Sequence, residues 1–222
     1  MEFISFYTSY LATVPALLAG IYCFHHLQGG LKWVFWFTVM GTLVQWSSRA
    51  IVWFGYYNIW MFHFYVPAEF FLLSMAYVRF LEGFTPKRTI YSVVAAFLLF
   101  CLIDSLIVFD FDTYHNYVRA IGGILLSGYT ILLYMKMMND MDIEHLSREP
   151  LVWINTAVFF HYSGSLFVFI TFNALLNISW ELSRVTYRIN SFLTVLLYLL
   201  VAVGFLKTTR SRRNRLIPDP LQ

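Results

Sequence analysis

The sequence predicts an all-α integral membrane protein built as a bundle of seven transmembrane helices. Hydrophobic residues make up 59% of the 222 residues and charged residues only 12%, and the mean hydropathy of +0.65 is high for a soluble domain of this size. One globular core is too small to bury so many apolar side chains, so a lipid bilayer is expected to cover the rest. Aromatic residues reach 20%, and amphipathic rings favour the membrane–water interface.

Seven apolar runs have about the 20 residues that an α-helix needs to cross roughly 30 Å of hydrocarbon. The runs are 3–25, 33–57, 61–81, 89–109, 117–137, 151–175 and 186–206. They are continuously apolar, whereas the strands of a membrane barrel alternate apolar and polar residues over about ten positions. Helices are therefore expected throughout.

Short polar breaks separate these runs and carry turn signals such as Gly29-Gly30, Asn58 and Pro86. None of the breaks is long enough to hold a soluble domain. We therefore expect residues 1–206 to form one seven-helix domain and residues 207–222 to form a short basic tail. Glu2 stands where a secretory signal would carry basic residues, so the first run is expected to be a retained span.

The distribution of basic residues predicts that the N-terminus lies outside and the C-terminus in the cytoplasm, because short cytoplasmic loops are enriched in Lys and Arg. Eleven of the fifteen Lys and Arg fall on the expected cytoplasmic side. They are Lys32, Arg79, Lys87, Arg88, Lys136, Arg148, Lys207, Arg210, Arg212, Arg213 and Arg215. We expect a multi-pass protein of a cell membrane, the bacterial inner membrane, whose basic tail contacts anionic lipid.

Two charged residues bound an otherwise uncharged stretch, RAIVWFGYYNIWMFHFYVPAE, from Arg49 to Glu69. If the chain turns near Asn58, these two residues lie about 14 and 17 Å from the turn along neighbouring antiparallel helices. A lone charge at such a depth costs at least about 2.5 kcal/mol. We therefore expect an Arg49–Glu69 pair that faces the interior of the bundle.

More polar residues lie in the same, outer half of the predicted spans, while the inner halves carry few. This asymmetry predicts an outward-opening polar pocket that binds a small polar or anionic ligand, because three arginines would face two carboxylates. The candidate ligand-binding residues are Arg49, Glu69, Asp104, Arg119, His161, Arg188 and Asn190, with His63, Tyr65, His115, Asn173 and Ser191 nearby. The alternative is that these residues only join helices or meet interfacial water.

The sequence predicts no catalytic residues, no metal site and no cofactor. His63, His115 and His161 are possible zinc ligands together with Glu69 and Asp104, but HExxH spacing is absent, as are GxSxG and P-loop motifs. The last run has no histidine, unlike zinc hydrolases of the ceramidase type, and no lysine before position 207 that could bind retinal. Nothing predicts a nucleic-acid partner.

A third-helix pattern, N-x-W-x-x-x-x-Y-x-x-x-E-F, is present as Asn58, Trp60, Tyr65, Glu69 and Phe70. With the run WINTAVFFHYSGSLFVF at 153–169, it resembles small seven-helix membrane proteins of bacteria to which no activity is assigned. Those proteins are similar to the seven-helix sensory modules of bacterial signalling proteins. The resemblance implies sensing.

The leading hypothesis is therefore a receptor-like protein that signals to a separate partner through the loop MMNDMDIEHLSREP, 137–150. Three alternatives stay open. One is a membrane enzyme acting on lipid, with Glu69, Asp104 and His161 as acid–base groups. The others are a small carrier and a structural subunit of a membrane complex.

Overall fold

The chain is all-α in the computed structural model, which describes residues 2–108, 116–140, 149–178 and 180–216 and somewhat fewer side chains. The predicted fold class is thus confirmed for this part of the chain. Its helices are α1 (Glu2–Cys23), α2 (Gly30–Trp53), α3 (Trp60–Phe80), α4 (Lys87–Val108), α5 (Asn116–Asp140), α6 (Pro150–Ile178) and α7 (Trp180–Leu216), with a single 3-10 turn, η1 (Phe24–His26).

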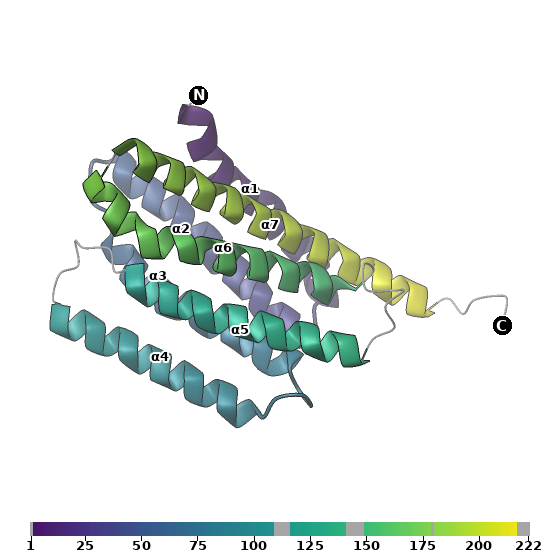
Figure 1. The fold of residues 1–222 in the computed structure, drawn as a ribbon. Coiled ribbons are helices and arrows are strands. Elements are labelled where there is room, and N and C mark those ends of the chain that lie inside the picture. The colour runs from purple at the N-terminus through teal and green to yellow at the C-terminus, as the bar shows by residue number, and fades with distance from the viewer. Residues whose placement is uncertain (1, 109–115, 141–148, 179, 217–222) are drawn as a thin grey trace.

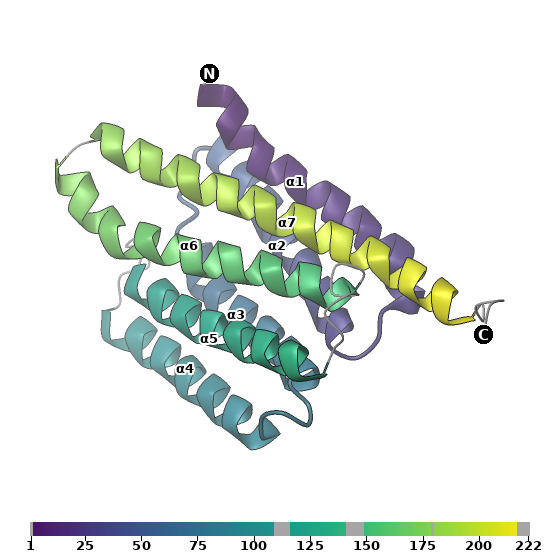
Figure 2. The ribbon, with the colours of Figure 1, turned by 45° about the vertical axis from the view of Figure 1, so that its right-hand side comes forward.

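The helices form one elongated bundle, with the start of α1 and the end of α7 toward opposite ends (Figure 1). Helix α7 contacts both α1 and α6, and α5 contacts both α6 and α3. Helix α3 also packs against α2 and α4. Helix α4 lies along one edge of the bundle, as both views show (Figures 1 and 2).

Five helices are long and apolar enough to cross a membrane, among the residues that the structure describes. These segments are Trp60–Phe80, Lys87–Leu106, Tyr117–Asn139, Pro150–Ile170 and Arg188–Thr209. Their outer surfaces carry large exposed apolar side chains, among them Leu99, Leu102, Phe167 and Ile170. Such surfaces require lipid contact, so the chain is a multi-pass membrane protein.

Helix α2 is long enough to cross a bilayer but is not among the five apolar segments. The polar residues Gln45, Ser48 and Arg49 in its second half account for the difference. The expected total of seven membrane crossings therefore stays a prediction.

Helix α2 ends at Trp53, four residues before the end of the predicted run at position 57. Gly55, with φ of 82°, begins the turn to α3 because this left-handed conformation is strained for other residues. The Asn58 side-chain amide donates a hydrogen bond to Ser48 Oγ at 2.5 Å, which holds the turn against α2.

Helix α7 continues past the expected boundary at position 206 and remains helical to Leu216. Thr208 is buried, and the Thr209 hydroxyl group donates to Cys23 Sγ of α1 at 3.3 Å. The first residues of the predicted tail, 207–209, thus pack within the bundle, and the side chains of 210–222 lie outside those described.

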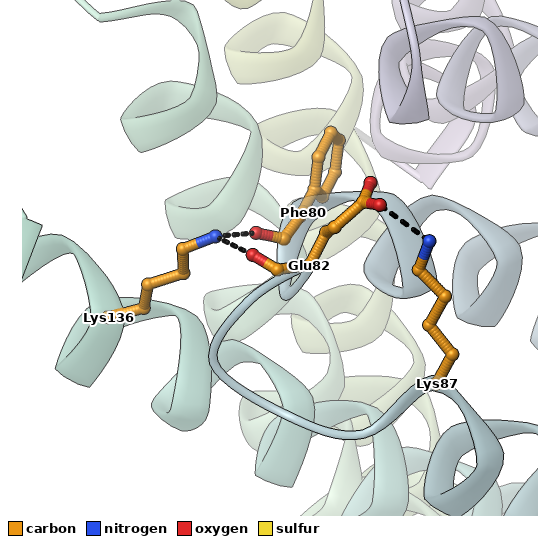
Figure 3. Close-up of polar contacts among 4 residues, drawn as sticks. All are labelled: Phe80, Glu82, Lys87 and Lys136. Carbon is orange, nitrogen blue, oxygen red and sulfur yellow. Dashed lines mark hydrogen bonds and ion pairs between the residues drawn. The ribbon is translucent and has the colours of Figure 1, made fainter.

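At the end of the bundle where α3 and α5 terminate, polar groups join neighbouring helices. Lys136 Nζ of α5 donates to the backbone carbonyls of Phe80 and Glu82, at 3.0 and 2.6 Å. Figure 3 shows these bonds with the exposed Lys87–Glu82 ion pair, 2.5 Å long. Lys87 lowers the pKa of the Glu82 carboxyl group by hydrogen bonding and by its charge. The two bonds from Lys136 give hydrogen-bond donors to backbone carbonyls at the C-terminus of α3 that have no partner within the helix.

A buried hydrogen-bond chain connects α3, α5 and α6 near the same end. The Tyr77 hydroxyl donates to Asn155 Oδ1 at 2.9 Å, and Asn155 Nδ2 donates to the Thr130 carbonyl at 3.0 Å. Asn155 and Tyr77 are almost fully buried. This chain of hydrogen bonds fixes the register of three helices.

We predict that Tyr77 and Asn155 are energetically coupled. Measured by a double-mutant cycle of unfolding free energy in detergent, Tyr77→Phe and Asn155→Ala should show an interaction of about 0.6 to 1.7 kcal/mol, the range of interhelical hydrogen bonds in membrane proteins. Thr209→Val, which removes a distant hydrogen bond, serves as the control and should add independently to Asn155→Ala. Simple additivity of the first pair would contradict the hydrogen bond.

Candidate functional site

A cavity of about 380 Å³ opens between the helices at the end of the bundle where α1, α3 and α5 begin. Residues from all seven α-helices of the described chain line it. They are Ser9, Tyr10, Val44, Gln45, Ser48, Phe62, Tyr65, Val66, Glu69, Phe70, Phe97, Arg119, Gly122, Gly123, Leu126, His161, Tyr162, Val168, Phe169, Asn190, Ser191, Thr194, Leu197 and Tyr198. The cavity size is typical of sites for small molecules.

Glu69 is the buried acidic group of this cavity and is 8% exposed. Its oxygen Oε1 accepts hydrogen bonds from the hydroxyls of Tyr162, at 2.6 Å, and Tyr65, at 3.1 Å. Tyr65 is one helical turn before Glu69 on α3, and Tyr162 comes from α6. Two hydroxyl donors compensate part of the cost of burying a carboxylate, and they tie α3 to α6.

Tyr198 of α7 completes the group of tyrosines around Glu69. Its hydroxyl lies within hydrogen-bonding reach of Tyr65 and Gln45, and its ring stacks on Phe37 with centroids 6.3 Å apart. Gly41 of α2 makes this position possible, because a Cβ atom there would collide with the Tyr198 hydroxyl. Helices α2, α3, α6 and α7 thus meet around one carboxylate.

Arg119 of α5 supplies the positive charge that acts on Glu69. Its guanidinium lies 5.2 Å from the ring centroid of Phe62 and 5.3 Å from that of Phe169. Such distances are those of cation–π contacts, which favour a fixed position of the guanidinium group. Arg119 is therefore held between rings of α3 and α6 at the cavity wall.

His161 and Asn190 also line the cavity, as the sequence predicted for a shared pocket. His161 interacts with the backbone of Leu193 on α7, while its Nδ1 atom is buried with no hydrogen-bond partner among the described residues. Asn190 Oδ1 accepts a hydrogen bond from Ser165 at 3.0 Å. These contacts hold α6 and α7 together beside the cavity.

Asp104, Arg49 and Arg188 do not line this cavity. Asp104 accepts a hydrogen bond from Tyr117 and lines a separate pocket of about 30 Å³ that also includes Arg119. Arg188 is exposed on α7, and Arg49 is half-buried on α2. The side chains of His115 and Asn173 lie outside the described residues. Of the seven candidate residues, four share the cavity.

The expected Arg49–Glu69 pair is wrong, because Glu69 interacts with Tyr65, Tyr162 and Arg119 instead. The early end of α2 explains the difference. Arg49 lies four residues from that end, about 6 Å, whereas Glu69 lies nine residues into α3, about 14 Å. The two charges are therefore at different depths, and Arg119 from α5 is the cation that acts on Glu69.

The cavity also contains residues that sequence reasoning missed. Gln45 and Ser48 of α2, Tyr10 of α1 and Tyr198 of α7 were not among the candidates. The sequence did contain a signal for Tyr65: it lies four residues before Glu69, and residues with this spacing lie on the same face of a helix. Tyr198 had no comparable signal, since its position depends on the small Gly41 of another helix.

The described part of the chain contains no cluster of three or more His, Cys, Asp or Glu side chains that could hold a metal ion. Cys23 and Cys101 are both buried, and neither forms a disulfide. Comparisons of the chain with protein-family models, curated proteins and solved structures find no match. The resemblance to seven-helix sensory modules therefore stays a prediction.

We predict that Gly41→Ala disturbs the tyrosines around Glu69, because the added Cβ meets the Tyr198 hydroxyl. Overpacking of this kind typically costs about 1 to 3 kcal/mol, and the unfolding free energy of the variant in detergent measures it. Gly128→Ala is the matched control, because a Cβ atom there meets nothing within 4 Å. Equal stability of the two variants would contradict the close approach of α2 and α7.

We also predict that Glu69 is coupled to Tyr162 and independent of Arg49. The double variant Glu69→Gln/Tyr162→Phe should be more stable than the sum of its single changes implies, by at least about 0.5 kcal/mol. Glu69→Gln/Arg49→Gln should be additive within about 0.5 kcal/mol. Coupling to Arg49 in place of Tyr162 would restore the original pair and refute the observed arrangement.

Proposed function

We propose that this protein is a receptor-like membrane protein that binds a small polar ligand in the cavity around Glu69. The main support for this proposal is the size of the cavity, about 380 Å³, together with the kinds of side chain that line it. Aromatic and aliphatic side chains form most of the wall, and a few polar groups, Glu69, Arg119 and His161, converge on it. Sites for small molecules have this composition, with apolar walls and few orienting polar groups.

The cavity is proposed to open to the outside. It lies at the end of the bundle where α1 begins, and the opposite end carries Lys32, Arg79, Lys87 and Lys136 near helix termini. Basic residues favour the cytoplasmic face, which supports an N-out, C-in arrangement. The bacterial inner membrane is proposed on the sequence resemblance alone.

The preference for an anionic ligand loses its main argument. It depended on three arginines facing the pocket, but Arg49 and Arg188 lie outside the cavity. One positive and one negative side chain, Arg119 and Glu69, remain in the wall. A small polar ligand without a large net charge fits this balance better.

Signalling through a separate partner is proposed because the cavity is lined by residues from several helices. A ligand that contacts α5, α6 and α7 together can favour one arrangement of these helices over another. Helices α5 and α6 then lead to the loop 137–150 at the other end of the bundle, which mostly lies outside the described residues.

A lipid-modifying enzyme has less support than a binding protein. Such an enzyme would bring Glu69, Asp104 and His161 within hydrogen-bonding reach of one substrate. Asp104 instead lines the smaller pocket with Tyr117 as its hydrogen-bond donor. A carrier would alternately expose the cavity to the opposite end, where Tyr77, Asn155 and Thr130 are bonded to one another.

We predict that at least one compound in a panel of small amines, carboxylates, amino acids and sugars raises the melting temperature of the purified full-length protein. At 100 times the dissociation constant, a bound ligand stabilises by about 2.7 kcal/mol. Thr194→Trp, which fills the cavity, should abolish this stabilisation.

Leu199→Trp is the matched control on the same helix, because Leu199 is 45% exposed and does not line the cavity. The stabilisation should persist in this variant. If no panel member stabilises the wild-type protein, or if stabilisation survives Thr194→Trp, the proposed binding function is refuted.

A further inference from the structure

Glu69 has one carboxylate oxygen that the described helices leave open to the cavity. Its Oε1 atom accepts both hydrogen bonds, from Tyr65 at 3.1 Å and from Tyr162 at 2.6 Å, and Oε2 accepts none from a described residue. Glu69 lines the cavity, and Oε2 is not one of the described atoms that are buried without a partner. An ionised carboxylate offers about four acceptor sites, so the capacity of Oε2 remains for a ligand.

The hydroxyl groups beside this carboxylate do not supply the missing donor. A tyrosine hydroxyl has one hydrogen atom, and those of Tyr65 and Tyr162 are directed to Oε1. The Tyr198 hydroxyl lies within hydrogen-bonding reach of Tyr65 and Gln45. The oxygen atoms of Tyr65 and Tyr162 therefore retain only acceptor sites, and the surroundings of Oε2 are rich in acceptors.

Net charge does not select the ligand of this cavity. The positive charge of Arg119 acts on Glu69, and Asp104 lines the smaller pocket together with Arg119. The charge of Arg49 acts on Tyr10 of the cavity wall. Two carboxyl groups and two guanidinium groups thus lie in this region, so their formal charges balance when both carboxyl groups are ionised. The hydrogen-bonding capacity of Glu69 is what discriminates between ligands, whatever further contacts the arginines make.

We propose that the cavity binds a small compound with a donor group, either a hydroxyl or an ammonium group, that donates a hydrogen bond to Oε2 of Glu69. This inference rests on the proposed binding function. The body of the compound is apolar, because Val66, Phe70 and Phe97 form the cavity wall near Glu69, with the two phenylalanine ring centroids 4.1 Å apart. A compound without the donor would remove water from Oε2 and leave that oxygen unpaired, which is unfavourable.

The test compares compounds that share one apolar body and differ in the donor group, on the full-length protein in nanodiscs. 2-Phenylethanol is compared with its methyl ether, which keeps the oxygen but has no O–H donor. Phenethylamine is compared with phenethyltrimethylammonium, which keeps the positive charge but has no N–H donor. The first pair tests the hydroxyl group and the second the ammonium group. Any panel member that stabilises the protein is compared with its methylated derivative in the same way.

We expect the donor compound of at least one pair to bind at least tenfold more tightly than its methylated partner. Calorimetry measures the dissociation constants, and empty nanodiscs correct for partition into lipid. Glu69→Gln should reduce this preference to less than threefold. The amide can keep its oxygen as acceptor for the tyrosines and place an N–H group at the position of Oε2.

Asp104→Asn is the matched control, because it makes the same chemical change at a carboxyl group outside the cavity. It should leave the tenfold preference unchanged, and an equal loss of preference in this variant would overturn the inference. The comparison on the wild-type protein decides the inference even if Glu69→Gln fails to fold. Equal binding within every pair, or an unchanged preference in folded Glu69→Gln protein, overturns it and leaves the proposed binding function standing. Binding of no compound at all refutes the proposed function itself.

Discussion

A carboxylate buried in an apolar bundle is the constraint on which the site depends. Glu69 is 8% exposed and satisfies part of its hydrogen-bonding capacity with hydroxyls from its own helix and from α6. An uncompensated charge there would be costly, so the surrounding helices must bring donors and a counter-charge to it. Tyr198 of α7 reaches Tyr65, a hydrogen-bond donor to Glu69, because Gly41 leaves space on α2. The cavity exists where these helices meet.

Buried polar groups are arranged differently at the two ends of the bundle. Near the ends of α3 and α5, Tyr77, Asn155 and Thr130 are joined directly, so the Tyr77 hydroxyl and one N–H of Asn155 Nδ2 are already used between helices. Around Glu69 and Arg119, opposite charges line one cavity. The first arrangement stabilises packing between helices, and the second suits the recognition of a small polar molecule.

Hydropathy predicted the all-α class and placed every helix within a few residues of its observed position, except α7, which begins six residues before the predicted run 186–206 and extends to Leu216. The cost of a buried charge correctly predicted that Glu69 faces inward. Its partner was wrong because the end of α2 depends on Gly55 and Asn58, whose turn shortens the helix and shifts the depth of Arg49. The tyrosines were hard to select because fifteen occur in the chain and most could equally occupy the membrane interface.

The most direct measurement is a magic-angle-spinning NMR correlation spectrum of the ¹³C-labelled protein in lipid bilayers, with the Glu69 side-chain carboxyl signal assigned by Glu69→Gln. With Tyr162 Oη only 2.6 Å from Glu69 Oε1, this carboxyl carbon should correlate with Cζ of Tyr162. Correlations with lipid acyl chains, and none with that tyrosine, would contradict an inward-facing carboxylate and remove the cavity's polar centre.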